Sequence, residues 1–244
     1  MMMAPFPLFP PGEEQTRALN CAALVPVKRL TQAKSRLAAH LTRSERETLV
    51  LTMLQHVVST LCESEAFEQV YVVSADAQVL ELAQHWGAEA LRETRPGHNP
   101  ALQAAAQVIL ERAAWRHRVS TRQQARPDSL DSAQGPGLLT ISADLPLLSQ
   151  EDVRALLICG ERSQVVLAAA SDCSGTNALL LRPPLLLPYL FGPASLSAYI
   201  QAARQRGLSP LLLHRAGLAF DVDTREDVHA LDERCRTCSP LAAM

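Results

Sequence analysis

Cationic side chains gather directly after the first predicted strand. The apolar run ALVPV at 23–27 is typical of a buried strand, and Lys28, Lys34 and Arg36 follow it. The chain as a whole is nearly charge-balanced, with a formal net charge of -2. These cations are therefore a local feature, and side chains of this type bind phosphate oxygens well.

Carboxylates follow two further predicted strands. Asp144 comes after the run LLTIS at 138–142, and Asp221 and Asp223 follow the last predicted strand and its turn. In an open α/β sheet, ligands collect at the carboxyl ends of the strands. Carboxylate oxygens are ligands that Mg²⁺ prefers. The three groups together predict a site for a nucleoside triphosphate and Mg²⁺ at one edge of a sheet.

Each group alone has a simpler interpretation. Lysines after a strand are commonly solvated, the DLP at 144–146 is also a common turn, and Asp221 or Asp223 could merely introduce the last helix. Neither GxxxxGK[ST] nor GxGxxG occurs in the sequence. If phosphates are bound, side chains and a loop of a different build must hold them.

The elements that would position these residues alternate between short β-rich runs and amphipathic segments. This alternation predicts an α/β fold with a mostly parallel sheet covered by helices. Further strands are predicted at 69–74, 137–142, 164–170 and 209–214. Predicted helix starts are Thr42 with Glu45 in a capping box, Asp76, Asn99 with Pro100 in a helix to about Trp115, Ser149, Ser195 and Thr224.

Length and composition favour one large α/β domain. The chain has 244 residues, 48% of them hydrophobic and 20% charged. We expect a single domain over 20–238, tails at 1–19 and 239–244, and a loop insertion at 116–136. The net charge of -2 gives no bulk attraction to nucleic acid or anionic lipid. No nucleic-acid or membrane partner is therefore expected.

The sequence also predicts a cytoplasmic protein. Its start lacks a basic n-region and is interrupted by prolines, and the most apolar later stretch carries Arg182 and four prolines. The six cysteines lie mostly isolated in apolar segments, so we expect small buried apolar residues and not a disulfide framework. Only Cys235 and Cys238, in CRTC, have a metal-like spacing, and because a zinc site needs about four ligands, a frayed helix end is the simpler interpretation.

Seven motifs, taken together, resemble the guanylyltransferases of coenzyme F420 biosynthesis. These enzymes activate a small phosphorylated carboxylic acid with GTP. The motifs occur in the family's order and span nearly the whole chain. They are PVKRLTQAKSRL (26–37), VVSAD (72–76), GHNPAL (97–102), ADLPLL (143–148), GTNALLLRPP (175–184), FGPASLSAYI (191–200) and LAFDVDTREDV (218–228).

The resemblance implies a three-layer fold of the nucleotide-diphospho-sugar transferase type and a nucleotidyltransferase reaction. GMP would pass from GTP to phosphoenolpyruvate with release of pyrophosphate, with Mg²⁺ as cofactor. The alternatives for the acceptor are 2-phospho-L-lactate and 3-phospho-D-glycerate. A homodimer would be in keeping with the family.

The resemblance also implies roles for individual residues. Acceptor-binding positions would be Thr176, Gly192 and Ser195, and metal-binding acids would be Asp144, Asp221 and Asp223. Lys28, Lys34 and Arg36 would hold the triphosphate. The residue types themselves suggest that Ser74, at a strand end, and Asn99, at a helix start, read the base, although both also make good caps or turn residues. They also suggest that Lys28, Asp144 and Asp223 are catalytic. Because Ser195 begins a predicted helix, we expect its hydroxyl and nearby N–H groups to face outward as an anion site.

Three other interpretations stay open at this point. A pyrophosphorylase acting on a sugar phosphate would carry a glycine-rich opening similar to GxGTR, which is absent. A non-catalytic nucleotide-binding module would be indicated by a missing metal carboxylate, yet all three acids are present. A nucleic-acid binder would rest on the basic residues of the 116–136 insertion alone.

Overall fold

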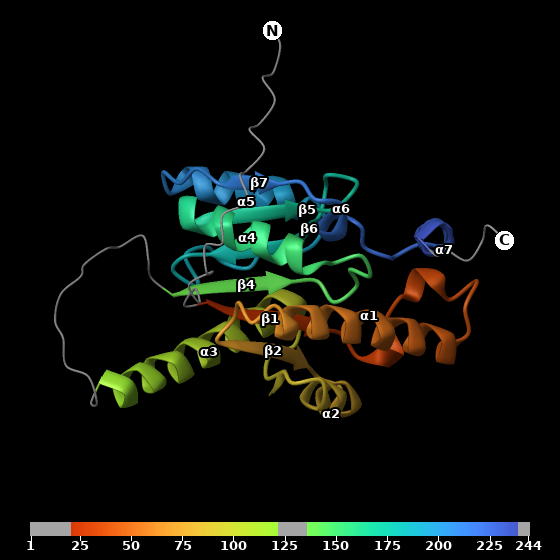
Figure 1. Ribbon diagram of the computed structural model, residues 1–244, viewed down its shortest axis with the longest axis horizontal. Coiled ribbons are helices and arrows are strands. Elements are labelled where there is room, and N and C mark those ends of the chain that lie inside the picture. The colour runs from red at the N-terminus through yellow and green to blue at the C-terminus, as the bar shows by residue number, and fades with distance from the viewer. Residues whose placement is uncertain (1–20, 122–135, 239–244) are drawn as a thin grey trace, which may run out of the picture.

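A computed structural model describes residues 21–121 and 136–238 of the protein. It contains a seven-stranded sheet in the order β3-β2-β1-β4-β6-β5-β7 (Figure 1). The paired strands are parallel except that β6 is antiparallel to both β4 and β5. The strands are β1 (Cys21–Val27), β2 (Gln69–Ser74), β3 (Glu89–Arg92), β4 (Gly137–Ile141), β5 (Val165–Ala169), β6 (Thr176–Leu181) and β7 (Leu211–Leu213).

Helices cover both faces of this sheet and confirm the predicted three-layer α/β architecture. One core cluster joins the sheet to α1, α2, α4 and α6, and the other joins it to α3 and α5. The helices are α1 (Arg43–Glu63), α2 (Ala77–His85), α3 (His98–Thr121), α4 (Gln150–Arg162), α5 (Ser195–Gln205), α6 (Ala216–Ala219) and α7 (Arg225–Cys238), with 3-10 turns η1 (Leu30–Gln32) and η2 (Ser35–Leu37).

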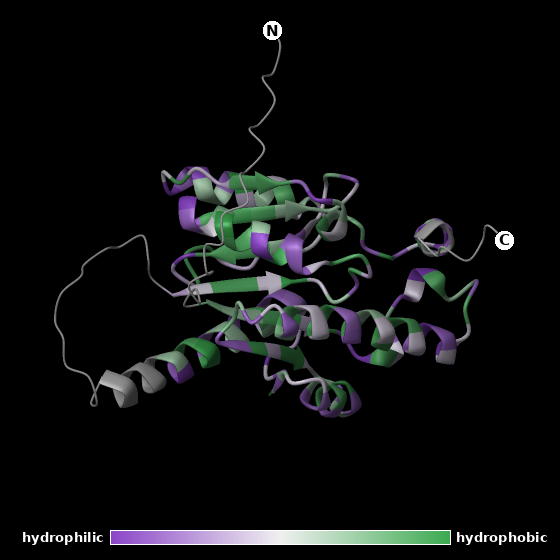
Figure 2. Cartoon of the chain, viewed as in Figure 1, coloured by the Kyte–Doolittle hydropathy of each residue, from purple (hydrophilic) through white to green (hydrophobic). Residues whose placement is uncertain are grey.

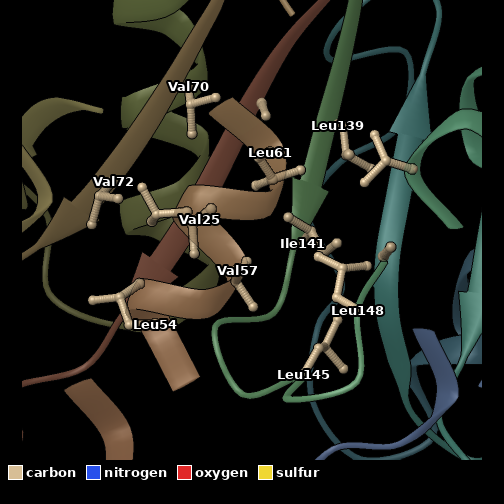
Figure 3. Close-up of a cluster of buried hydrophobic side chains, with 14 of the residues drawn as sticks. Val25, Leu54, Val57, Leu61, Val70, Val72, Leu139, Ile141, Leu145 and Leu148 are labelled. Carbon is tan, nitrogen blue, oxygen red and sulfur yellow. The ribbon is translucent and has the colours of Figure 1, made fainter. Parts of the chain in front are cut away.

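The strands are apolar on both faces because helices bury both faces. In β1, Ala23 and Val25 belong to one core cluster, whereas Leu24 between them belongs to the other. Figure 2 shows the strands as predominantly hydrophobic and the helices as mixed. Figure 3 shows Leu54, Val57 and other residues of α1 packed over the central strands. Continuous burial of this kind fixes the strands that carry the site.

Helix caps confirm the predicted starts of α1, α2 and α4. Thr42 and Glu45 form a capping box at α1, and the carboxylate of Asp76 accepts the N–H of Gln78 at the start of α2. Ser149 forms a second capping box, with Asp152. Each cap satisfies backbone donors that have no partner within the helix. The caps therefore set where the preceding loops end.

The predicted and observed elements differ in several places, and β6 and α6 are also absent from the prediction. The short strand β3 was not predicted, because four residues give too little periodicity to detect. Helix α3 begins at His98 rather than after an Asn99 cap, and it continues to Thr121, so residues 116–121 are helical instead of belonging to the predicted 116–136 loop. The rest of that loop, at 122–135, and the predicted tails at 1–19 and 239–244 lie outside the described residues.

No helix in the described part of the chain is long and apolar enough to cross a membrane. Cys21 is buried and Cys62 and Cys159 are partly buried, and all three are free thiols. Their packing agrees with the expectation that they act as small apolar residues. The side chains of Cys235 and Cys238 lie outside the described part, so the prediction that they belong to a frayed helix end stays a prediction.

Truncation of one core residue of α4 should destabilise the fold strongly. Leu156 is fully buried in the cluster that joins α4 to the sheet, so Leu156→Ala should lower the free energy of unfolding by about 2–5 kcal/mol. Ile158, on the same helix, is 37% exposed, and Ile158→Ala should cost much less. Urea unfolding followed by circular dichroism measures both, and similar losses for the two variants would contradict this packing.

Candidate functional site

A pocket of about 410 Å³ opens at the carboxyl edge of the sheet, where the sequence predicts a ligand site. The end of β1, the loop that follows it, the loop after β4, α1 and the start of α3 all contribute to its wall. Its polar lining residues are Lys28, Gln32, Lys34, Ser35, Arg36, His98, Ser142, Asp144 and Asp223. The three predicted cations and two of the three predicted acids are thus brought together.

The loop after β1 is held rigidly by its own buried residues and by neighbouring elements. Leu30 and Leu37 are buried, and the N–H of Leu30 donates to Asp76 Oδ2 at 3.1 Å. Arg46 of α1 donates to the carbonyl of Ala33 at 3.1 Å. A loop anchored in this way presents its cations at fixed positions.

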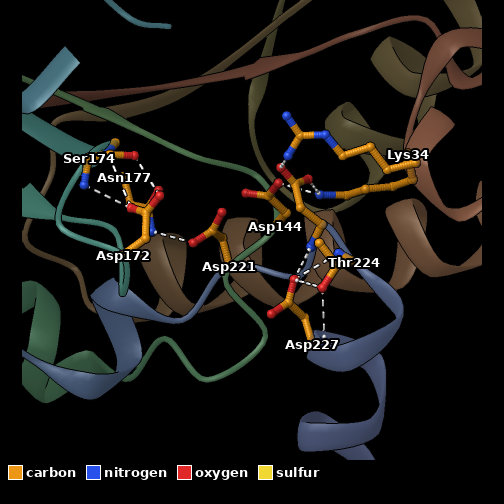
Figure 4. Close-up of polar contacts among 11 residues, drawn as sticks. Lys34, Asp144, Asp172, Ser174, Asn177, Asp221, Thr224 and Asp227 are labelled. Carbon is orange, nitrogen blue, oxygen red and sulfur yellow. Dashed lines mark hydrogen bonds and ion pairs between the residues drawn. The ribbon is translucent and has the colours of Figure 1, made fainter. Parts of the chain in front are cut away.

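Lys34 is the cation that the loop places most precisely. Its backbone is left-handed, with φ of 50°, and its side chain is only 7% exposed. The Nζ atom donates to Asp144 Oδ2 and, at 2.8 Å, to Asp223 Oδ1 (Figure 4). Burial opposes the charged ammonium, but the charges of Asp144 and Asp223 outweigh it and raise the pKa of Lys34. Lys34 therefore stays charged between two carboxylates.

Asp223 remains ionised because it faces several cations. Burial tends to raise the pKa of Asp223, but the charge and hydrogen bond of Lys34, followed by the charges of Arg36 and Lys28, lower it below its ordinary value. Its backbone N–H donates to Asp227 Oδ2 at 3.0 Å, at the start of α7. Asp227 therefore holds the backbone of Asp223, and Lys34 holds its carboxylate.

Lys28 and Arg36 differ from Lys34 in being accessible. Both are exposed, and the Arg36 side chain, at 73% exposure, lies 3.6 Å from Asp223 Oδ2 in a long ion pair. Exposed pairs of this length contribute little to stability. Lys34 thus organises the acids, whereas Lys28 and Arg36 can turn toward an incoming anion.

A second pocket of about 200 Å³ adjoins the first. The two share Pro26, Val27, Lys28, Gln32 and His98 in their walls. Glu93 is the acidic residue in the wall of the second pocket, and it follows β3 directly, with its N–H donating to the carbonyl of Ser74 at 2.9 Å. The sequence prediction missed Glu93 because it missed β3, whose end is the signal that would have located it.

His98 lies between the two pockets at the start of α3. Burial of the imidazole, followed by the positive charge of Lys28, lowers the pKa of His98, whereas the negative charge of Asp144 raises it. A neutral imidazole at this position can both donate and accept a hydrogen bond. Sequence reasoning had no way to single it out, because its neighbours in the pocket come from β1 and β4.

Asp221 lies beside the pocket, between Asn177 and Asp144 (Figure 4). Burial raises the pKa of Asp221, a hydrogen bond of 3.1 Å from Asn177 lowers it, and the charges of Asp144 and Asp223 raise it further. The net effect is an upward shift. Clustered carboxylates of this kind are stabilised by a cation placed among them.

The predicted acceptor residues meet at the start of β6. Because β6 runs antiparallel to β4, its first residues lie at the carboxyl edge of the parallel strands, and Ser142 N–H donates to the carbonyl of Asn177 at 2.8 Å. The Ser195 hydroxyl donates to Thr176 Oγ1 at 3.2 Å, and both residues are buried. Gly192 has φ of 138°, and open space surrounds the position of an added Cβ.

The structure corrects the expected outward-facing anion site at Ser195. The side chain is 1% exposed, and the N–H groups of Ser195 and Leu196 donate to the carbonyls of Gly192 and Ser174. These donors are used to close the turn before α5, whose N-cap is Ala194 with φ of 56°. Any contact with an acceptor at this point would be through hydroxyl oxygens and the Gly192 turn.

The structure places the two predicted base-reading residues away from both pockets. Ser74 is fully buried, and its Oγ accepts the N–H of Asp76 at 3.1 Å. Both polar groups of Asn99 bind the backbone of Phe191 at 2.9 Å. Neither residue is in a pocket wall.

The carboxylates suit a hard divalent cation by chemistry, although they are not arranged as a ready-made chelate. Among the described residues, no three His, Cys, Asp or Glu side chains converge as a metal-binding group. Asp144 and Asp223 nevertheless share one cation, the Lys34 ammonium. Oxygen donors around a shared positive charge are compatible with Mg²⁺.

The fold defines the class of protein. A solved structure from Desulfovibrio desulfuricans G20, provisionally named a nucleotide-diphospho-sugar transferase, superposes with a TM-score of 0.69 at 17% sequence identity and covers 90% of this chain and 89% of its own. The predicted fold class is confirmed. The protein is therefore an α/β protein of the nucleotide-diphospho-sugar transferase fold.

The chain belongs to the family described as "Guanylyl transferase CofC like", which matches residues 21–114 and 127–232. Phosphoenolpyruvate guanylyltransferase of Rubrobacter xylanophilus is 41% identical over 215 residues, covering 88% of this chain and 94% of its own. Two relatives are each 33% identical: 2-phospho-L-lactate guanylyltransferase of Methanothermobacter thermautotrophicus (86% and 83% covered) and 3-phospho-D-glycerate guanylyltransferase of Phenylobacterium zucineum (84% and 86%). The family predicted from the seven motifs is thus confirmed.

Removal of the buried ammonium should raise the pKa of Asp223. Lys34→Met deletes the strongest influence that lowers that pKa, whereas Lys28→Met deletes the weakest. Titration of the carboxyl group by NMR should therefore show a clear upward shift in Lys34→Met and a small one in Lys28→Met. Equal shifts in the two variants would contradict the arrangement.

The same substitution should change the pH dependence of stability. A depressed carboxyl pKa stabilises the folded state above the unfolded pKa of about 3.9, and this stabilisation disappears as the pH falls through the folded pKa. The difference in unfolding free energy between wild type and Lys34→Met should therefore shrink from about pH 6 to about pH 3. A difference that stays constant over this range would contradict the pKa assignment.

Proposed function

We propose that the protein transfers GMP from GTP to a small phosphorylated carboxylic acid, with phosphoenolpyruvate as the first candidate, and releases pyrophosphate. The observation that carries this proposal is the Lys34 ammonium between Asp144 and Asp223, with exposed Lys28 and Arg36 around the same pocket. Family membership supports the reaction type, and the name of the most similar relative reported above supports the acceptor.

The chemistry needs positioning and charge neutralisation more than an activated nucleophile. An oxygen of the acceptor phosphate attacks the α-phosphorus of GTP, the bond from that phosphorus to the β-phosphate oxygen breaks, and pyrophosphate leaves with the electron pair. Because both reactants are anions, the main barriers are their approach and the charge on the leaving group. Lys28 and Arg36 would neutralise the leaving pyrophosphate.

Asp144 and Asp223 would hold Mg²⁺, with Asp221 beside them. When bound, the ion supplies charge neutralisation to phosphate oxygens. Lys34 would orient both carboxylates, because its Nζ donates to each of them, and it would keep Asp223 ionised. Asp221 is oriented by Asn177, which also donates to the carbonyls of Leu218 and Ala219.

The second pocket would receive the guanine base. Guanine presents N–H donors on its Watson–Crick edge, and a carboxylate can accept two of them. Glu93 lies in the wall of this pocket together with Gly97 and Ala75, and the absence of large side chains at these two positions leaves room for a ring. Ser74 would act indirectly, since its carbonyl accepts the Glu93 N–H.

Thr176, Gly192 and Ser195 would bind the acceptor. Thr176 begins β6, next to the end of β4, and therefore lies on the same sheet edge as Asp144. Phosphoenolpyruvate, 2-phospho-L-lactate and 3-phospho-D-glycerate share a phosphate and a carboxylate and differ by small groups. Such differences are worth only about 1–3 kcal/mol in a pocket, so a direct comparison of acids is required.

Pyrophosphate release by the purified protein tests the reaction. With Mg²⁺ and GTP, we expect release with phosphoenolpyruvate and slower release with 2-phospho-L-lactate or 3-phospho-D-glycerate. ATP and CTP in place of GTP should give little. GTP binding without release for any acid would contradict catalysis and favour a non-catalytic nucleotide-binding module.

Neutralising either acid of the pocket should abolish turnover. Asp144→Asn and Asp223→Asn should each lower kcat by at least about 100-fold, because each removes charge that would hold the metal. Asp232→Asn, on the exposed face of α7, is the matched control and should keep normal turnover. Near-normal turnover in Asp144→Asn would remove the metal assignment.

Loss of the Glu93 charge should affect the nucleotide alone. Glu93→Gln keeps the size but removes one acceptor, so the KM for GTP should rise about tenfold or more while the KM for the acid stays within about twofold. Glu81→Gln, at an exposed position of α2, is the control. An unchanged KM for GTP would place the base elsewhere.

A further inference from the structure

Asn99 makes an unusual pair of contacts for a side chain near the start of a helix. Its Oδ1 accepts the backbone N–H of Phe191 at 2.9 Å, and its Nδ2 donates to the carbonyl of the same residue at 2.9 Å. The side-chain amide thus pairs with one residue as a neighbouring strand would. Phe191 immediately precedes Gly192, so Asn99 holds the turn that leads into Ser195.

That turn has a backbone that needs external support. Gly192 and Ala194 both have positive φ, at 138° and 56°. Conformations of this kind are costly for an alanine and persist where the surroundings hold them. The Leu190 N–H donates to Tyr199 Oη at 2.8 Å, and the Phe191 ring packs edge-on against Tyr199, with ring centroids 5.5 Å apart. Asn99 adds two hydrogen bonds to this support from a different helix.

The residue before Asn99 faces the nucleotide side. His98 lines both pockets, and its ring meets the Phe191 ring edge-on, with centroids 5.7 Å apart. Consecutive residues of α3 therefore contact the pocket and the turn. The start of α3 joins the proposed nucleotide site to the proposed acceptor site by direct contacts.

We propose that Asn99 is a positioning residue that fixes the turn 190–195 relative to the nucleotide pocket. By fixing this turn, Asn99 determines how well the phosphorylated acid binds. This inference rests on the proposed function for the identity of the acceptor. It differs from the sequence-based hypothesis that Asn99 reads the base. Reading a base would require the amide to give up two well-formed hydrogen bonds.

Steady-state kinetics separate the two roles. Asn99→Ala should raise the KM for phosphoenolpyruvate by about tenfold or more, since both hydrogen bonds to the turn are lost, while the KM for GTP stays within about twofold. Asn99→Asp keeps an acceptor but loses the donor, so its KM for the acid should be intermediate. Gln107→Ala removes an amide from an exposed position of the same helix and should change neither.

A rise in the KM for GTP equal to or larger than the rise for the acid would overturn the proposal and restore the base-reading role. Unchanged kinetics in Asn99→Ala would also overturn it. If Asn99→Ala does not fold, as judged by circular dichroism, Asn99→Asp is decided by the same two KM values.

Hydrogen exchange gives a readout that does not depend on activity. In the wild-type protein the Phe191 amide is held by Asn99, so peptides covering 186–196 should exchange faster in Asn99→Ala and Asn99→Asp but not in Gln107→Ala. Unchanged exchange in both Asn99 variants would overturn the proposal even in an active enzyme. Faster exchange in a protein that transfers no GMP would instead overturn the proposed function and leave the positioning contact intact.

Discussion

The arrangement of the site depends on one ammonium group buried between two carboxylates. Lys34 donates to Asp144 and Asp223, which come from segments far apart in the chain. Without a cation between them, two carboxylates that share one partner would repel each other. The left-handed backbone of Lys34, the anchoring of its loop on Asp76 and the hold of Asp227 on the Asp223 backbone all serve this placement. Lys28 and Arg36 are thereby left accessible at the rim.

The reversal of one strand brings the other half of the site to the same edge. In an all-parallel sheet the start of β6 would lie at the opposite edge from the end of β4. Because β6 is antiparallel, Thr176 and Asn177 lie beside Ser142 and the acids. The turn before α5 then reaches Thr176 through Ser195, and α3 reaches the turn through Asn99. Nucleotide and acceptor sides are joined through contacts between side chains and backbone.

Residues of the same type differ in their ion pairing and pKa because they differ in burial and in their charged neighbours. Lys34 is almost fully buried and paired, whereas Arg36 is mostly exposed. Similarly, Asp223 is held ionised by cations, whereas the pKa of Asp221 is raised by burial and by its acidic neighbours. Residues of the same type that look equivalent in the sequence therefore have different surroundings in the site.

The sequence by itself determined the α/β layering, the capped starts of α1, α2 and α4, and the family, because these depend on local periodicity, short-range capping and motifs read in order. It also singled out the cations and acids. Lys28 and Asp144 do follow the ends of β1 and β4, whereas Asp221 and Asp223 follow the short helix α6 and not the last strand, as the sequence had predicted. Only the tertiary structure decided which of them meet. Residue spacing does not encode the pairing of Lys34 with the acids, the direction of β6, or the use of Asn99 on Phe191. Glu93 was missed because β3 was not predicted, and His98 was missed because the residues around it in the pockets follow β1 and β4, which are distant in the chain.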